Sequence, residues 1–148
     1  MPYKKTLRLL VLPLCLVACG EVEDTRPGQP VAHRQRAFKD ILNRFEPMGI
    51  QLRQEGYEAE SFLVHARQLA AIKDAPWAYF GADTQYPPSK ADDALWTEMD
   101  TFNAERDKFL QAADALLVAA ETRSADAARA AYAPVQESCR SCHKRYKH

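Results

Sequence analysis

The chain lacks several features that would place it in other classes of protein. It has only five glycines in 148 residues, no segment of alternating apolar and polar residues, and no excess of charge, with 20 Lys+Arg against 20 Asp+Glu. The missing alternation argues against β-strands, and the charge balance gives no sign of nucleic-acid binding. Hydrophobic residues make up 47% of the chain and charged residues 27%, which is typical of a folded, helix-rich protein.

The N-terminal apolar run is too short to cross a membrane. Lys4, Lys5 and Arg8 precede the run from Leu9 to Ala18, whereas a membrane span needs about 20 apolar residues. A basic start, a short apolar run and a small last residue predict a signal peptide over residues 1–18. Its removal would leave 17 Lys+Arg against 20 Asp+Glu.

The end of the predicted signal, Leu16 to Cys19, resembles the cleavage site of bacterial lipoproteins. The resemblance implies a periplasmic protein whose only membrane contact is a lipid on Cys19. Ordinary cleavage after Ala18 would instead leave a soluble periplasmic protein. Residues 19–30 are polar and are expected to form a tether, followed by a folded domain over residues 31–148.

Apolar residues recur at helical spacing in four segments of this domain. The expected helices cover residues 31–56, 58–72, 91–120 and 124–148. The third is expected to be the longest, and an irregular connection is expected over residues 74–89. Four amphipathic helices with mostly short links predict an all-α, antiparallel four-helix bundle.

Three residues refine these bounds. Pro47 lies inside the first expected helix and would kink it or end it early. Ser124 is a good N-cap for the last helix. Pro134 lies inside that helix and is expected to bend or interrupt it.

The motif Cys139-Arg-Ser-Cys142-His143 gives the clearest chemical signal. On a helix these three side chains share one face, so both thiols could bond to the vinyl groups along one porphyrin edge while the imidazole stands over the iron. C-x-x-C-H is the attachment signature of c-type haem, and His is a common axial ligand of haem iron. We therefore predict one covalent haem c in the bundle, attached through Cys139 and Cys142, with His143 as an iron ligand.

Other interpretations of the motif are weaker. A thioredoxin-type C-x-x-C opens a helix in a βαβ fold, and no such pattern is present. A closed zinc site needs four ligands, and the further histidines are His33, His65 and His148. A helical lipoprotein without haem is a third alternative.

The chain resembles the cytochrome c′ family over about residues 31–147. The matching landmarks are Arg34-Gln35 with Phe38, the segment Ala75–Gly81, Ser89-Lys90 before Leu95-Trp96, and the haem motif at the extreme C-terminus. The resemblance implies a four-helix bundle that is usually a homodimer. It also implies a five-coordinate haem iron that binds nitric oxide and carbon monoxide, with no enzymatic turnover.

Site residues follow from the resemblance by position. His143 would be the proximal iron ligand, and Phe38 would cover the vacant distal face. Arg34, Gln35 and Lys90 would lie near the haem edge or the propionates, and Lys147 beside the proximal imidazole. Each has a plainer alternative: Phe38 could be ordinary core, Arg34 a solvated residue and Lys147 frayed surface.

The sequence thus favours a periplasmic gas-binding cytochrome that could also transfer electrons to a partner not identified by sequence. The alternative is a six-coordinate electron carrier with a Met ligand. Only Met48 and Met99 follow the signal, and Met48 lies ten residues beyond Phe38, about 15 Å along a helix. His33 could bind the open position, but on a helix it points about 100° away from Arg34.

Overall fold

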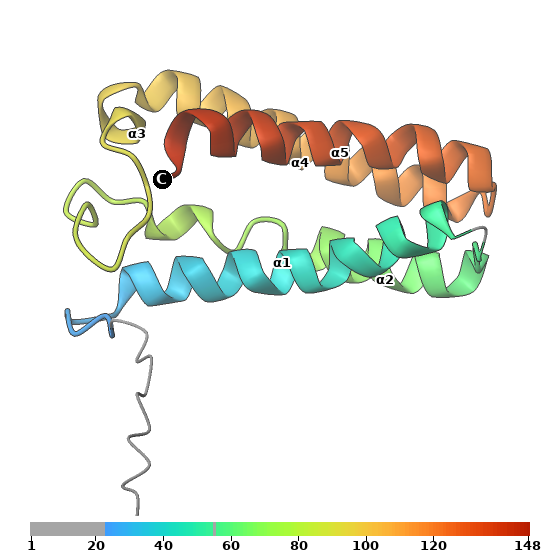
Figure 1. Cartoon of the computed structure of the whole chain (residues 1–148), viewed down its shortest axis with the longest axis horizontal. Helices are drawn as coiled ribbons and strands as arrows, with labels where there is room; N and C mark the ends of the chain where they lie inside the picture. Colours follow the sequence, from blue (N-terminus) through green and yellow to red (C-terminus); the bar gives the residue numbers. More distant parts are fainter. Residues whose placement is uncertain (1–22, 55) are drawn as a thin grey trace, which may run out of the picture.

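The protein folds as two antiparallel pairs of long helices. The computed structural model describes residues 23–54 and 56–148. One pair is α1 (Pro30–Arg53) with α2 (Ala59–Ile72), and the other is α4 (Met99–Glu121) with α5 (Ala125–Tyr146). The two pairs form the two layers in Figure 1, and α2 packs on α4. The predicted four-helix bundle is confirmed.

Apolar residues at helical spacing form the core between the layers. Phe45 and Met48 of α1, Phe62 of α2, and Phe109 and Leu116 of α4 are all buried. Ser124 caps α5 as predicted, because its side chain accepts a hydrogen bond from the N–H of Ala127.

Neither internal proline ends its helix. Helix α1 continues through Pro47 to Arg53, three residues before Gly56, and α5 is continuous through Pro134. Of the two outcomes expected at Pro134, the interruption is therefore wrong, and the bend stays a prediction. Each proline removes one N–H donor from its helix, and packing of the buried face compensates for that loss.

The expected single helix over residues 91–120 is also wrong. A short helix, α3 (Ala94–Thr97), precedes α4, and the backbone of Glu98 between them leaves the helical region, with φ −121° and ψ 40°. The Glu98 carboxylate accepts a hydrogen bond from Arg145 at 2.8 Å, so a long-range contact accompanies the break. As a result α1, with 24 residues, is longer than α4, with 23.

The connection between α2 and α3 is irregular, as expected, and contains a 3₁₀ turn at Trp77–Tyr79. Its last part meets the end of α5 through an isolated antiparallel bridge between Ala91 and Lys147. None of the described helices is long and apolar enough to cross a membrane. The predicted signal peptide and Cys19 lie outside the described residues.

The tether is shorter than expected. Asp24 is buried, and its carboxylate accepts hydrogen bonds from the N–H groups of Val31 and Ala32. Gln29 donates to the carbonyl of Asp24. Residues 24–29 therefore belong to the folded domain, because the Asp24 carboxylate bonds to N–H groups in the first turn of α1 that have no partner within the helix.

Candidate haem-attachment site

Helix α5 carries the cysteine motif in its last two turns. Cys139 and Cys142 are free thiols, both half-buried, and they contact different apolar clusters. Cys139 packs against the main core, while Cys142 packs against a smaller cluster that includes Phe102 and Tyr146. The two thiols therefore face apolar surroundings on the inner side of the helix, as the spacing predicts.

Burial changes the acidity of these groups. It raises the pKa of Cys139, and it raises that of Cys142 to about 11 with help from the Glu105 and Cys139 charges. Burial and then the Lys147 charge lower the pKa of His143. Near neutral pH the site thus presents two protonated thiols and a neutral imidazole, which can bind a metal.

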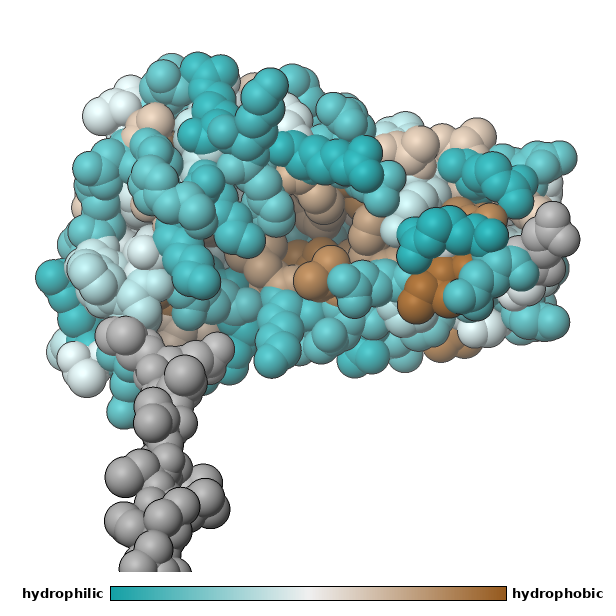
Figure 2. Space-filling model, viewed as in Figure 1, coloured by the Kyte–Doolittle hydropathy of each residue, from teal (hydrophilic) through white to brown (hydrophobic). Residues whose placement is uncertain are grey.

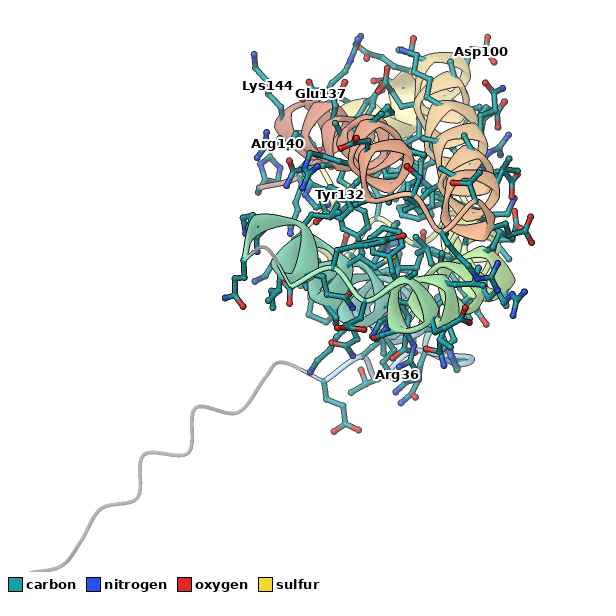
Figure 3. All side chains as sticks on the ribbon, turned by 90° about the vertical axis from the view of Figure 1, so that its right-hand side faces the viewer. Arg36, Asp100, Tyr132, Glu137, Arg140 and Lys144 are labelled. Atoms are coloured by element: carbon teal, nitrogen blue, oxygen red, sulfur yellow. The ribbon has the colours of Figure 1, made fainter. Side chains whose placement is uncertain are left out.

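Helices α1 and α5 approach each other closely where Gly49 faces Tyr132. There the ring of Tyr132 stacks on Phe45 with the ring centroids 4.2 Å apart. Gly49 makes this possible, since a Cβ there would lie 2.8 Å from Cζ of Tyr132. Figure 3 shows Tyr132 pointing from α5 into the space between the two helix pairs.

Phe38 lies two turns from this stack along α1, on the side of the cysteines. Its ring meets Trp77 edge to face with the centroids 5.4 Å apart, and Phe80 at 6.2 Å. Figure 2 shows apolar surface along the seam between α1 and α5. An apolar, planar group attached to Cys139 and Cys142 would meet apolar side chains on both sides of the thiols, and His143 on the same helix would ligate its iron.

Trp77 is the centre of the aromatic cluster. Its ring lies within 6.3 Å of the rings of Phe38, Phe80, Phe102 and Phe109. The sequence predicts that Trp77 packs and takes no part in the chemistry, and these contacts confirm the packing. Its partners were not predictable, because Trp77 lies in an irregular connection without periodicity. Its indole N–H donates to the carbonyl of Lys73.

Arg34 is buried and binds the connection between α2 and α3. Its guanidinium donates to the carbonyl oxygens of Tyr79 and Thr84 and to the hydroxyls of Thr84 and Ser89. It also lies over the ring of Phe80, 4.8 Å from the centroid. Arg34 therefore holds this connection against α1, and the alternative that it is a solvated residue is wrong. Its role at the haem edge stays a prediction.

The remaining predicted residues fall into two groups. Gln35, on α1, donates to the carbonyl of Pro88, and His33 stacks on Tyr79 with the centroids 5.1 Å apart. Lys90, in the connection before α3, and Lys147, just after α5, are both exposed, and the carbonyl of Lys90 accepts a hydrogen bond from the N–H of His148. The role of each of these residues stays a prediction.

Comparison with known proteins gives one consistent result. The family model described as Cytochrome C' matches residues 29–147. A cytochrome c' of Alcaligenes xylosoxydans is 27% identical over 123 residues, which covers 82% of this chain and 95% of the relative. A cytochrome c' of Rubrivivax gelatinosus is 27% identical over 124 residues, which covers 82% of this chain and 96% of the relative.

Solved structures agree. The crystal structure of cytochrome c' from Rubrivivax gelatinosus has a TM-score of 0.79 at 26% identity, covering 85% of this chain and 100% of the other. Cytochrome c prime from Shewanella frigidimarina also has a TM-score of 0.79, at 29% identity, covering 83% of this chain and 97% of the other. Mutants of the protein from Alcaligenes xylosoxidans have been solved as a nitric oxide complex and in a carbon monoxide-bound form.

Proposed function

Because the chain belongs to the cytochrome c′ family, whose cofactor is covalently attached haem c, we propose that it is a periplasmic cytochrome with a five-coordinate haem that binds nitric oxide and carbon monoxide. Cys139 and Cys142 hold the haem, and His143 ligates the iron on the α5 side. The bound haem supplies an iron with one open coordination position. Gas complexes of related structures support this proposal.

The position of the Phe38 ring is the observation that carries the proposal. Phe38 lies on α1, and its half-buried ring packs against Trp77 and Phe80 of the connection after α2. An apolar ring there offers neither an iron ligand nor a hydrogen bond, so bound O₂ gains little polar stabilisation. The ring thus leaves the open position of the iron to a small gas and keeps water away from it. We assign no catalytic residue.

Titration of the reduced, haem-loaded protein with nitric oxide tests the proposal. We expect a stoichiometric change in the haem absorption spectrum, and a matching change with carbon monoxide. No change with either gas would overturn the proposal.

The alternative is an electron carrier with a Met ligand. Met48 is fully buried in the main core, whereas Met99 packs against the same cluster as Cys142. Neither Met99→Leu nor Met48→Leu should change the spectrum of the reduced protein. A shift with either variant would favour the electron carrier.

The location is proposed from the sequence. We propose that lipid on Cys19 anchors the domain to a membrane facing the periplasm. The mature protein should then have the mass of residues 19–148 plus haem and lipid. The mass of the same residues and haem without lipid would mean ordinary cleavage after Ala18.

We also propose that the domain forms a homodimer. Leu42 and Ile50 on α1 and Val64 on α2 are large apolar side chains, each 45–49% exposed, and a second copy could cover them. Light scattering during gel filtration should give twice the monomer mass; the mass of a monomer at micromolar concentration would contradict this.

A further inference from the structure

Hydrogen bonds of Asp24 hold the first residues of the folded domain in place. The buried Asp24 carboxylate accepts hydrogen bonds from the N–H groups of Val31 at 3.0 Å and Ala32 at 3.1 Å, and from the Tyr86 hydroxyl at 2.9 Å. Asp24 is five residues beyond Cys19, and five extended residues span at most about 17 Å. A lipid on Cys19 would therefore hold the start of α1 close to the membrane surface.

The same end of the bundle carries the end of α5. The connection between α2 and α3 touches both termini: Arg26 donates to the carbonyl of Asp83, and the N–H of His148 donates to the carbonyl of Lys90. Figure 1 shows the C-terminus and the start of α1 at one end of the molecule. A membrane near the start of α1 is thus also near the last turns of α5.

Those last turns are strongly basic. Residues 138–148 contain four Lys and Arg residues and no Asp or Glu, although the chain after the predicted signal has more acidic than basic residues. One of the four, Arg145, forms an ion pair with Glu98. His148, when it is protonated, pairs with Asp92.

Arg140 and Lys144 are one helical turn apart and exposed. Neither takes part in an ion pair within residues 23–54 and 56–148. Figure 3 shows both pointing outward from α5, on the side away from α2. Glu137, the nearest acid along the helix, also points outward and forms no ion pair among the described residues.

We propose that Arg140 and Lys144 bind the anionic phospholipid headgroups of the membrane that holds the lipid anchor. The anchor alone would leave the domain free to turn about its short tether. Contact through these two cations fixes one orientation, with the haem-bearing half of α5 at the membrane surface. This inference rests on the anchor proposed at Cys19, because without it the domain would rarely approach the membrane.

Vesicle binding tests the inference without the lipid. The full mature chain, loaded with haem, is exported with Cys19→Ser behind an ordinary cleavable leader. It should cosediment with vesicles of equal parts phosphatidylglycerol and phosphatidylcholine at low salt, and not with phosphatidylcholine alone. Cations near an anionic surface contribute about fivefold each to binding, so Arg140→Glu with Lys144→Glu should weaken it by at least about 25-fold.

Arg123→Glu with Arg129→Glu is the charge control. It changes the net charge equally near the start of α5, with Arg123 in the turn before the helix and Arg129 in its second turn, and should alter binding by less than about threefold. Equal losses in both double variants, or no binding to the anionic vesicles, would overturn the inference. A loss of electron transfer to an acidic redox protein in Arg140→Glu with Lys144→Glu, with vesicle binding unchanged, would also overturn it, because the cations would then serve a protein partner. Since no variant carries lipid, failure here leaves the mass test of Cys19 unaffected.

Discussion

At the scale of single residues, the site depends on two thiols and one imidazole that share a side of α5. This part was predictable, because three residues within one turn and a half need no tertiary information to be placed together. The partners across the bundle were less predictable. The apolar spacing placed Phe38 on the inner side of α1, but its contacts with Trp77 and Phe80 depend on a connection without periodicity.

Removing both thiols tests the attachment directly. Cys139→Ala with Cys142→Ala should leave protein from which acid–acetone extraction removes all haem, because no thioether bond can form. Cys139→Ala alone should retain haem through Cys142. Haem that stays with the double variant after extraction would show that attachment occurs elsewhere.

Phe38→Ala tests the distal position. Truncating this half-buried ring should cost about 2–4 kcal/mol of unfolding free energy, because its contacts with Trp77 and Phe80 are lost. It should also speed carbon monoxide association, since the ring no longer has to move before a ligand binds. Flash photolysis and thermal unfolding measure the two effects. Destabilisation with unchanged association would mean that Phe38 is core and another residue covers the iron.

At the scale of helices, local pattern predicted which segments are helical better than where they end. Four segments with helical spacing became the four long helices. The break at Glu98 was not predictable, because it coincides with contacts to Arg145 and Tyr146, which lie 47 and 48 residues along the chain. At Pro134 the sequence predicted a possible break where the helix is continuous. The loss of one hydrogen bond does not interrupt a helix that is packed along its length.

The contact of Gly49 with Tyr132 sets how closely α1 and α5 approach. Gly49→Ala would gain about 1 kcal/mol of helix propensity but would place a methyl group against the Tyr132 ring. We expect a net loss of about 1–3 kcal/mol in unfolding free energy. In a Tyr132→Ala background the same change should be neutral or stabilising. Equal effects in both backgrounds, measured by denaturant unfolding, would mean that the contact does not limit the approach.

At the scale of the whole molecule, Asp24 ties the start of the domain to α1 and to Tyr86. Burial acts to raise its pKa, but hydrogen bonds from Ala32, Tyr86, Arg26 and Val31 outweigh burial, and the pKa of Asp24 is lowered. A group with a lowered pKa in the folded state stabilises the protein above its unfolded pKa, about 3.9 for Asp. That stability is lost as the pH falls through the folded pKa.

Asp24→Asn should therefore lower the melting temperature at pH 7. The difference from the natural protein should narrow as the pH falls below about 4. Thermal unfolding followed by circular dichroism at several pH values measures both trends. A difference that stays constant with pH would contradict the account, because it would come from packing and not from the charge.

The coordination of the iron is the central claim for the whole molecule. An absorption spectrum of the reduced, haem-loaded protein without added gas tests it most directly. With His143 on one side and the apolar Phe38 on the other, the account predicts the broad visible bands of a five-coordinate, high-spin iron. Sharp, resolved bands of a low-spin, six-coordinate iron would contradict it and would favour an electron carrier with a second protein ligand.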